Sequence, residues 1–428
     1  MDEFQKLTDE NQKLKLAVNE LSILNNIASS ISSTQSVEEI IDMIVLKCVK
    51  HLHVEEGTVS LLVKEEEGEI FHTMIRKQDL TQKQVPFHLD NQITGWMLLK
   101  QEPLLSNDVI NDSRFTLPDN NDRSIRNMLC VPLIAKGKLI GYLAVFNKKN
   151  EKDFEDKDRR LLTIIASQSA QIIENSRLYE EEKECLLLKE EMKVATRIQN
   201  NLLPDSNPEI SGYEIAGMNI PAKEVGGDYY DFITLSNSNL GFCVGDVTGK
   251  GMPAALLMAN LQASLRSQAL INLGSRECVS NINKLLHRNT DPSKFATLFY
   301  GVLDPANHEI HYCNAGHDQP LIFRGKKLFS SLEATGMLLG VLGEAEYESE
   351  KLSLLPNDTV VIYTDGITEA MNKDYEQFGL ERTINVVEKN YSESASFILK
   401  EIYDQVKLHS DGFKQSDDIT IMVIKRVE

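Results

Sequence analysis

The sequence predicts an α+β protein with two globular domains joined by a charged helix. A chain of 428 residues exceeds what one ordinary hydrophobic core supports. Its second half alternates short apolar runs with helical segments, and a charged stretch without glycine or proline precedes Pro204. These observations predict four segments. They are an N-terminal helix or coiled coil over 1–20, a first domain over 21–178, a helical linker over 179–204 and a second domain over 205–428.

Composition and charge narrow the class of protein. The chain is 42% hydrophobic and 25% charged, as soluble globular proteins are, and carries a formal net charge of −19. Such a surface repels nucleic acid and anionic membrane, so neither is an expected partner. The six cysteines are scattered without a CxxC pair, and no apolar run approaches the length of a membrane span. We therefore expect a cytoplasmic protein.

The first domain has helical periodicity at both ends and strand-like runs between them. Leu7, Leu14 and Leu21 stand at heptad spacing, which indicates the start of a helical coil. Helices are expected at 21–31, 37–52 and 158–179, and strands at 56–64, 68–75 and within 127–147, where the AKGK turn closes a hairpin. The predicted domain is a mixed sheet flanked by helices.

The linker carries a short heptad seam. Cys185 and Met192 repeat at one heptad position, and Leu188, Ala195 and Leu202 repeat at the other. A partner helix on this seam would make the protein a homodimer. An amphipathic helix lying on its own domain is the alternative.

The second domain is rich in apolar strands that predict two antiparallel sheets covered by helices. The expected strands are 212–220, 231–235, 240–246, 295–304, 309–316, 320–324, 358–366 and 418–427. The expected helices are 252–271, 275–289, 379–389 and 392–408.

One glycine-rich stretch, GDVTGKG at 245–251, invites comparison with a nucleotide-binding loop. A Walker A loop has four residues between its first glycine and the Gly-Lys pair, followed by Ser or Thr. Here three residues separate Gly245 from Gly249, and Gly251 follows Lys250. The stretch therefore does not match a phosphate-binding loop.

Aspartates recur at the ends of the predicted strands of the second domain. Asp228 and the pair Asp417 and Asp418 precede strands, whereas Asp246 and Asp365 follow them. A single such residue is more often a turn or cap residue. If the strands form one sandwich, however, the acids meet at a common rim, where their mutual repulsion requires a divalent cation. An oxygen-only ligand set favours Mg²⁺ or Mn²⁺ over zinc.

The motifs around these acids carry a specific family resemblance. IQNNLLP, EVGGDYYDF, VGDVTGKGMPAALLMA, FATLFYGVLD, CNAGHDQPLI, VIYTDGITEAMN and SDDITIMVI occur in the order found in bacterial PPM/PP2C-like serine phosphatases of the SpoIIE and RsbU type. The resemblance, over about 190–428, implies a PP2C-like αββα sandwich with two Mn²⁺ or Mg²⁺ ions. It implies the ligands Asp228, Asp246, the carbonyl of Val247, Asp365 and Asp417, with Asp246 bridging both ions. Of the last acidic pair, Asp418 is expected to form the turn or to support the ligands, although either acid could point inward.

The resemblance also implies a reaction. A metal-bound hydroxide would attack phosphoserine or phosphothreonine in line, and no phosphoenzyme would form. The catalytic carboxylates would be Asp228, Asp246, Asp365 and Asp417. We expect Lys250 to be solvated rather than near the phosphate. His317 is expected to have a structural role, so no general acid is assigned.

Residues 20–178 resemble a GAF domain, a fold that commonly binds small molecules. Asn147, Lys148, Phe154 and Asp158 match part of a cyclic-nucleotide-linked signature, but Arg159 replaces its final acid. A small-molecule ligand and ligand-free dimerisation are both open. The whole architecture resembles regulators that dephosphorylate an anti-anti-sigma (STAS-type) protein. The alternatives are a catalytically weak scaffold and a ligand sensor that uses the phosphatase fold for partner binding.

Overall fold

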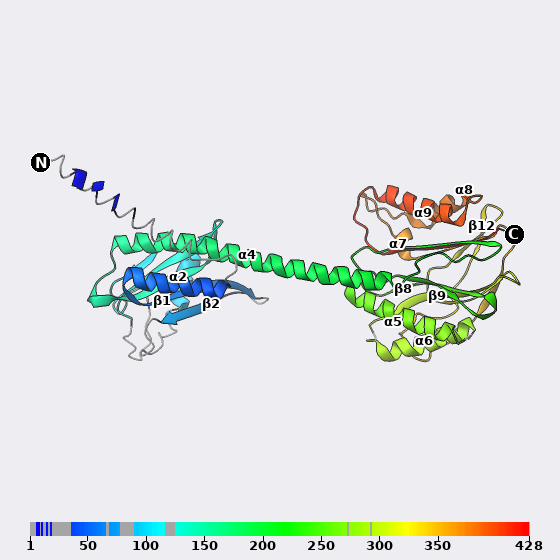
Figure 1. Cartoon of the computed structure of the whole chain (residues 1–428), viewed down its shortest axis with the longest axis horizontal. Coiled ribbons are helices and arrows are strands. Elements are labelled where there is room, and N and C mark those ends of the chain that lie inside the picture. The colour runs from blue at the N-terminus through cyan, green and yellow to red at the C-terminus, as the bar shows by residue number, and fades with distance from the viewer. Residues whose placement is uncertain are drawn as a thin grey trace. The chain divides into compact units, whose positions relative to one another are not determined.

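The chain divides into two compact units, residues 1–187 and 188–428, in a computed structural model (Figure 1). The structure describes residues 6–8, 10, 11, 14, 15, 18, 36–65, 68–77, 90–115, 125–271, 274–291 and 293–427. Leu7 and Leu14 are helical and exposed, as a coil would require. The helix expected at 21–31 and Leu21 lie outside the described residues.

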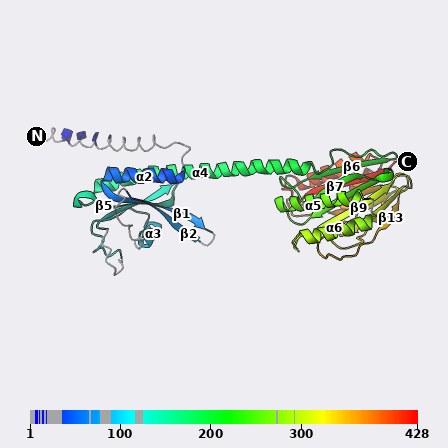
Figure 2. The same cartoon turned by 60° about the horizontal axis from the view of Figure 1, so that its bottom comes forward.

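The first unit is a five-stranded sheet with helices on both faces. Its elements are α2 (Val37–Leu52), β1 (Val54–Glu65), β2 (Gly68–Lys77), α3 (Asp90–Lys100), β3 (Leu104–Ser106), β4 (Met128–Ala135), β5 (Lys138–Lys148), a 3₁₀ turn (Lys149–Glu151) and the start of α4 (Asp156–Asn200). Helices α2 and α4 lie on one face of the sheet and α3 lies on the other, as Figure 2 shows. The buried side chains of α2 and α4 belong to one apolar core, and those of α3 belong to a second. Helix α2 begins at the predicted residue because Ser36 and Glu39 form a capping box.

The sheet of this unit differs from the prediction in its directions, and it includes a short strand, β3, that was not predicted. Its order is β2-β1-β5-β4-β3, and every described pair is antiparallel, so the expected mixed sheet is wrong. The reason lies in the connections. A tight turn at Lys136 and Gly137, both with positive φ, joins β4 to β5, and such a hairpin necessarily runs antiparallel.

The linker is part of one helix, α4, which runs without a break for 45 residues. Residues 177–191 are exposed along the whole stretch, and Leu188 keeps 62% of its surface exposed. The helix ends at Asn200, so Leu202, the last residue of the predicted seam, lies in the following turn and not on the helix. Pairing of the remaining seam with a second helix stays a prediction.

The second unit is the predicted αββα sandwich. Its sheets have the orders β13-β10-β9-β8-β7 and β12-β11-β14-β15-β6, with antiparallel pairs throughout. The strands are β6 (Tyr213–Ile220), β7 (Tyr229–Thr234), β8 (Leu240–Val247), β9 (Ala296–Asp304), β10 (Glu309–Ala315), β11 (Leu321–Arg324), β12 (Lys327–Ser331), β13 (Glu350–Ser353), β14 (Thr359–Tyr363) and β15 (Ile419–Arg426). The helices are α5 (Met252–Ala269), α6 (Ser275–Asn289), α7 (Asp365–Thr368), α8 (Gly379–Lys389) and α9 (Ala395–Ser410), with a 3₁₀ turn at Ser236–Ser238.

Three layers of apolar contact hold the sandwich together. Helices α5 and α6 pack on the first sheet, and α8 and α9 pack on the second, on the outer faces seen in Figure 1. Between the sheets, Phe299 stacks on Tyr312 with ring centroids 5.4 Å apart, and Phe242 lies beside Phe299. This buried layer fixes the strand ends that carry the acids.

Two edge strands, β12 and β13, and the one-turn helix α7 were not predicted from the sequence. The residues of the two edge strands are almost all exposed or half-buried, so they lack the apolar alternation that marks a strand. In the part of the chain that the structure describes, no helix combines the length and the apolar character needed to cross a bilayer.

Candidate metal centre

The predicted acids come from both sheets and meet at one rim of the sandwich. Asp228 immediately precedes β7, and Asp246 is the penultimate residue of β8, in the first sheet. Asp365 begins α7 two residues after the end of β14, and Asp417 lies two residues before β15, with both strands in the second sheet. Residues nearly 200 positions apart in the chain therefore become neighbours, because the two sheets face each other.

Asp228 is the most enclosed of these acids, with 3% of its surface exposed. Its Oδ2 accepts hydrogen bonds from Thr364 Oγ1 at 2.7 Å and from Thr420 Oγ1 at 2.5 Å. Thr364 directly follows β14 and Thr420 lies in β15, both in the opposite half of the sandwich, so the bonds join the two halves at the rim. Burial, and then the neighbouring Asp246, raise the pKa of Asp228 well above its ordinary value.

Asp246 and Asp365 have raised pKa values for the same two reasons. Burial, followed by the charges of Asp365 and Asp417, raises the pKa of Asp246 to about 7. Burial, followed by the charges of Asp417, Asp318 and Glu369, raises the pKa of Asp365 to about 6. The acids therefore share one electrostatic environment, and their ionised forms lack sufficient compensation from protein cations.

Lys250 differs from the expectation of a solvated side chain. Its Nζ lies 2.9 Å from Asp417 Oδ2 and donates to the carbonyl of Ser416 at 2.6 Å. The reason is local: Lys250 follows β8, the strand that carries Asp246, and the acidic rim attracts its amino group. The expectation that Lys250 is merely solvated is therefore wrong. Its ion pair partly neutralises the outermost acid.

Asp418 organises the main chain before β7 through its side chain. Its Oδ1 accepts from the amide of Ala222 at 2.7 Å, and its Oδ2 accepts from the amide of Gly227 at 2.6 Å. Both oxygens are thus used in shaping the loop that leads to Asp228. This is the geometry of a turn-forming residue rather than of a direct ligand.

Glycines around the rim let backbone groups approach closely. A Cβ on Gly227 would lie 2.8 Å from the carbonyl oxygen of Val247, the predicted main-chain ligand. A Cβ on Gly366 would lie 1.9 Å from the carbonyl oxygen of Asp418, which no side chain tolerates. Glycine is therefore sterically required after Asp365, where the segment that follows β14 lies against the segment that leads into β15.

The donor set fits a hard divalent cation. It consists of carboxylates and one main-chain carbonyl, which are the ligands that Mg²⁺ and Mn²⁺ prefer. Among the described residues, no three His, Cys, Asp or Glu side chains stand close enough to form a ready coordination shell. The raised pKa values nevertheless show that the acids interact, and Asp417 is turned toward Lys250. A cation would have to draw the carboxylates together.

His317 is enclosed beside the rim, with 4% of its surface exposed. Its Nδ1 is 2.8 Å from Thr297 Oγ1, and its main-chain amide donates to Asn314 Oδ1. Burial lowers its pKa to about 4, so the imidazole is neutral near pH 7 and supplies no proton there. These contacts agree with the expected structural role.

The sequence reasoning missed the residues that support the acids. Thr364 and Thr420 hold Asp228, and Gln199 at the end of α4 clamps the loop before it. The two threonines flank predicted acids in YTDG and DDIT, and this adjacency was the only signal available. Gln199 lies in the IQNNLLP motif, but the motif does not indicate its partner, which is the main chain of Gly226.

We expect Thr364→Val and Thr420→Val each to weaken Mn²⁺ binding by about 10-fold or more, since a ligand's outer partners commonly contribute this much. Valine keeps the shape but cannot donate to Asp228, whose ionised form is then less favourable. Titration calorimetry with Mn²⁺ measures the effect. The matched control is Thr359→Val, whose hydroxyl is buried without a partner in the described structure. Unchanged affinity in both test variants would contradict this role.

The side chains of the partial GAF signature in the first unit form contacts within the protein. Lys148 and Asp158 form an enclosed ion pair, and Lys148 lies 5.6 Å from the ring of Phe154. Asn147 Oδ1 accepts from the amide of Arg126. These residues therefore join the end of β5 to the start of α4, which is a structural role.

A helix-covered pair of antiparallel sheets with clustered carboxylates at one rim defines a metal-dependent phosphatase of the PP2C class. Comparison with known proteins specifies it further. The family model "Stage II sporulation protein E (SpoIIE)" matches residues 236–427, and a GAF domain model matches residues 34–174.

Individual relatives agree with these matches. Phosphoserine phosphatase RsbU of Bacillus subtilis (strain 168) is 30% identical over 242 residues, covering 56% of this chain and 71% of RsbU. Protein IcfG of Synechocystis sp. is 29% identical over 263 residues, covering 55% of this chain and 41% of IcfG. The solved SiaA-PP2C domain of Pseudomonas aeruginosa has the same fold, with a TM-score of 0.50, 19% identity and coverage of 56% of this chain and 98% of that domain. The chain therefore belongs to the SpoIIE/RsbU family of PPM-type serine phosphatases and carries a GAF domain before the catalytic fold.

Proposed function

We propose that this protein hydrolyses phosphoserine or phosphothreonine on a regulatory protein with the help of two Mn²⁺ or Mg²⁺ ions. The observation that carries the proposal is the meeting of Asp228, Asp246, Asp365 and Asp417 at one rim, where the pKa of the first three is raised. Such a cluster is stable in ionised form only with added positive charge. The name of the relative RsbU, a phosphoserine phosphatase, supports the same reaction.

The residues of the rim have distinct roles in this proposal. Bound ions would supply a hydroxide near neutral pH and neutralise the phosphoryl oxygens. Asp246 would contact both ions, and Asp228, Asp365, Asp417 and the carbonyl of Val247 would complete the ligand set. Thr364 and Thr420 fix the orientation of Asp228, and the glycines keep side chains out of the approach to the rim.

The substrate we propose is a phosphorylated anti-anti-sigma (STAS-type) protein. Support comes from the family resemblance and from the architecture, in which a GAF domain precedes the phosphatase fold. All six cysteines are free and five are buried, which suits a reducing compartment such as the cytoplasm. The exposed face of α4 around Leu188 supports a homodimer through the linker, and a small-molecule ligand of the GAF domain remains part of the proposal.

The test of the reaction is hydrolysis of p-nitrophenyl phosphate by the full chain with and without Mn²⁺. The proposal expects turnover that requires the metal and is lost in Asp365→Asn. A catalytically silent scaffold would give the same background for both proteins. A ligand sensor with weak phosphatase output would instead show turnover that rises markedly only when a GAF ligand is added.

We further propose that the GAF domain controls the metal centre through the C-terminal end of α4. Gln199 Nε2 donates to the carbonyl of Gly226 at 2.7 Å, and the amide of Gly226 donates to Gln199 Oε1 at 3.0 Å. Thr196 Oγ1 also donates to the carbonyl of Glu224 at 2.8 Å. The helix thus holds the loop that delivers Asp228, so a change in helix packing would order or release a metal ligand.

Gln199→Ala should lower the affinity for Mn²⁺ by about 10-fold to 100-fold, because a residue that positions a ligand contributes in this range. The two bonds to Gly226 disappear, and the loop before Asp228 loses its anchor. Calorimetry with Mn²⁺ and turnover of p-nitrophenyl phosphate as a function of Mn²⁺ concentration measure the change. Gln405→Ala is the control, since that half-buried side chain donates to Glu401 within α9 and has no contact with the rim among the described residues. Wild-type metal affinity in Gln199→Ala would exclude this route of control.

A further inference from the structure

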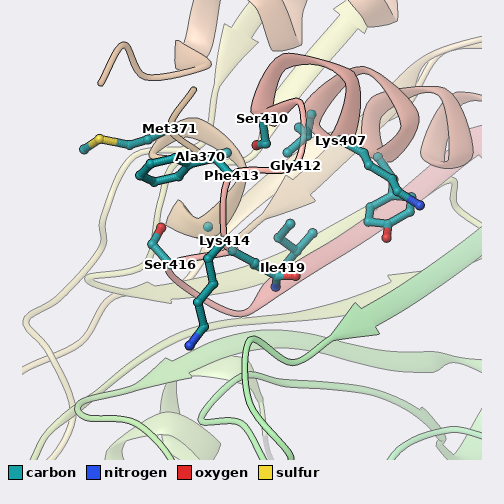
Figure 3. A pocket seen from close by; sticks show the side chains of 13 residues that line it. Ala370, Met371, Lys407, Ser410, Gly412, Phe413, Lys414, Ser416 and Ile419 are labelled. Atoms are coloured by element: carbon teal, nitrogen blue, oxygen red, sulfur yellow. The ribbon is translucent and has the colours of Figure 1, made fainter. Parts of the chain in front are cut away.

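A cavity of about 210 Å³ lies beside the metal centre in the second unit (Figure 3). Its wall includes Gly366 and Ser416, which are the neighbours in sequence of Asp365 and Asp417. The end of α9 and the loop that leads to β15 form much of the remaining wall. Any group in this cavity is therefore close to the acids that define the rim, yet none of the acids lines it.

The lining of the cavity is mainly apolar. Ala370, Met371, Phe413 and Ile419 contribute to it, and Figure 3 shows Phe413 beside Met371 and Ala370. Phe413 keeps 38% of its surface exposed, and its ring meets the edge of Tyr375 with centroids 5.8 Å apart. An exposed aromatic wall around an open apolar hollow favours an apolar occupant.

The size of the cavity limits what that occupant can be. An apolar cavity of about 150 Å³ holds a molecule of the size of benzene. Sites for drug-sized molecules and cofactors usually occupy about 300–1,000 Å³. The observed volume therefore suits one leucine-sized or phenylalanine-sized side chain and is too small for a nucleotide.

Positive charge accompanies this apolar hollow in a chain of net charge −19. Lys407 and Lys414 both line the cavity and are exposed, and their amino groups extend away from its centre in Figure 3. Neither lysine forms an ion pair with any residue that the structure describes. Both amino groups are consequently available to carboxylates of a bound partner.

We propose that this cavity binds an apolar side chain of the phosphoprotein substrate, from the segment that carries the phosphoserine, and that Lys407 and Lys414 contact acidic residues of the same segment. The inference rests on the proposed phosphatase function and adds a determinant of substrate choice. Gly366 and Ser416 line the cavity and are adjacent in sequence to Asp365 and Asp417 of the rim. A segment whose phosphoserine lies at the rim therefore places its neighbouring residues over the cavity.

The experiment uses the full chain with Mn²⁺ and a library of phosphoserine peptides in which each flanking position is varied in turn. We expect the wild-type protein to prefer a large apolar residue at one flanking position by at least ~10-fold in kcat/KM, as apolar pockets commonly discriminate. Ser410→Trp, which fills the cavity from the end of α9, should abolish this preference. Lys414→Glu should reduce the preference for acidic residues by about fivefold, the size expected of an exposed ion pair.

Two controls separate the possible failures. Ser396→Trp introduces the same side chain at an exposed position near the other end of α9 and should leave the preference unchanged. Turnover of p-nitrophenyl phosphate, which is too small to reach the cavity, should stay within about twofold of wild type in every variant. If wild-type protein does not turn over this compound, the proposed function itself fails.

If that turnover is normal but the library shows no apolar preference, or Ser410→Trp preserves the preference, the cavity proposal is overturned. Fluorescence anisotropy of labelled library peptides gives a second readout that does not depend on turnover. Binding that is equal in wild type and Ser410→Trp would also overturn it.

Discussion

Asp246→Asn is expected to lower kcat/KM for p-nitrophenyl phosphate with Mn²⁺ by about 10³-fold or more. Burial, followed by the charges of Asp365 and Asp417, raises the pKa of Asp246 to about 7, so this carboxylate interacts with the other acids of the rim. Metal ions contribute several kcal/mol to the stabilisation of a phosphoryl-transfer transition state, and each 1.36 kcal/mol corresponds to about a factor of 10 in rate. An amide cannot bridge two cations, so most of this stabilisation should be lost. Steady-state kinetics over a range of Mn²⁺ concentrations measure it.

The control for this variant is Asp304→Asn, at the end of β9 in the same sheet. Asp304 accepts hydrogen bonds from Ala306 and Asn307 within a surface turn, and it is not one of the acids of the rim. Its turnover should match wild type. If Asp246→Asn kept more than about a tenth of wild-type activity at saturating Mn²⁺, Asp246 could not be the bridging ligand.

The same residue predicts how the stability of metal-free protein depends on pH. The pKa of Asp246 is about 7 in the folded protein, above the ordinary value of 3.8, so the folded state binds the proton more tightly than the unfolded state. This contribution to stability is fully present below pH 4 and is lost as pH rises through 7. Thermal melts with EDTA should therefore show a fall in Tm between about pH 4 and 7 that is larger in wild type than in Asp246→Asn. Parallel profiles for the two proteins would refute the assignment of the raised pKa.

Gly366→Ala is the second change with a large expected effect. The added Cβ would lie 1.9 Å from the carbonyl oxygen of Asp418, so α7 or the start of β15 must shift. Either shift displaces Asp365 or Asp417, and small displacements of catalytic groups commonly reduce rates by about 10²-fold. We expect at least this loss of turnover, together with a lower Tm in metal-free protein. Kinetics and calorimetric melts of the purified variant measure both.

Gly95→Ala is the matched control. Gly95 lies in α3 of the first unit, and an added Cβ there meets no atom within 4 Å. Alanine is favoured over glycine in a helix by about 1 kcal/mol, so its stability should be equal or higher and its turnover unchanged. Wild-type activity in Gly366→Ala would contradict this prediction, because the backbone would then accommodate the added Cβ without displacing Asp365 or Asp417.

Much of the architecture can be predicted from the sequence, because residues that become buried recur with the period of the helix or strand that carries them. The predicted bounds of α2, α6 and α8 agree with the structure, since apolar spacing and the local start signals of helices are properties of neighbouring residues. The acids could be proposed as a group because each stands at the end of an apolar strand. Edge strands β12 and β13 leave no such record, as their residues face solvent.

What the sequence by itself determined was the pair of domains, the sandwich and the set of acids that define the rim. Only the tertiary structure decided how those acids are supported. Asp418 accepts hydrogen bonds from amides about 190 positions earlier in the chain, Asp228 is held by Thr364 and Thr420 at the edge of the opposite sheet, and the exposed Lys250 forms an ion pair with Asp417. Such contacts depend on the distance and register between two packed sheets, which no local pattern encodes. The apolar cavity beside the rim arises in the same way, from residues of α7, α9 and β15 that share no spacing in the sequence.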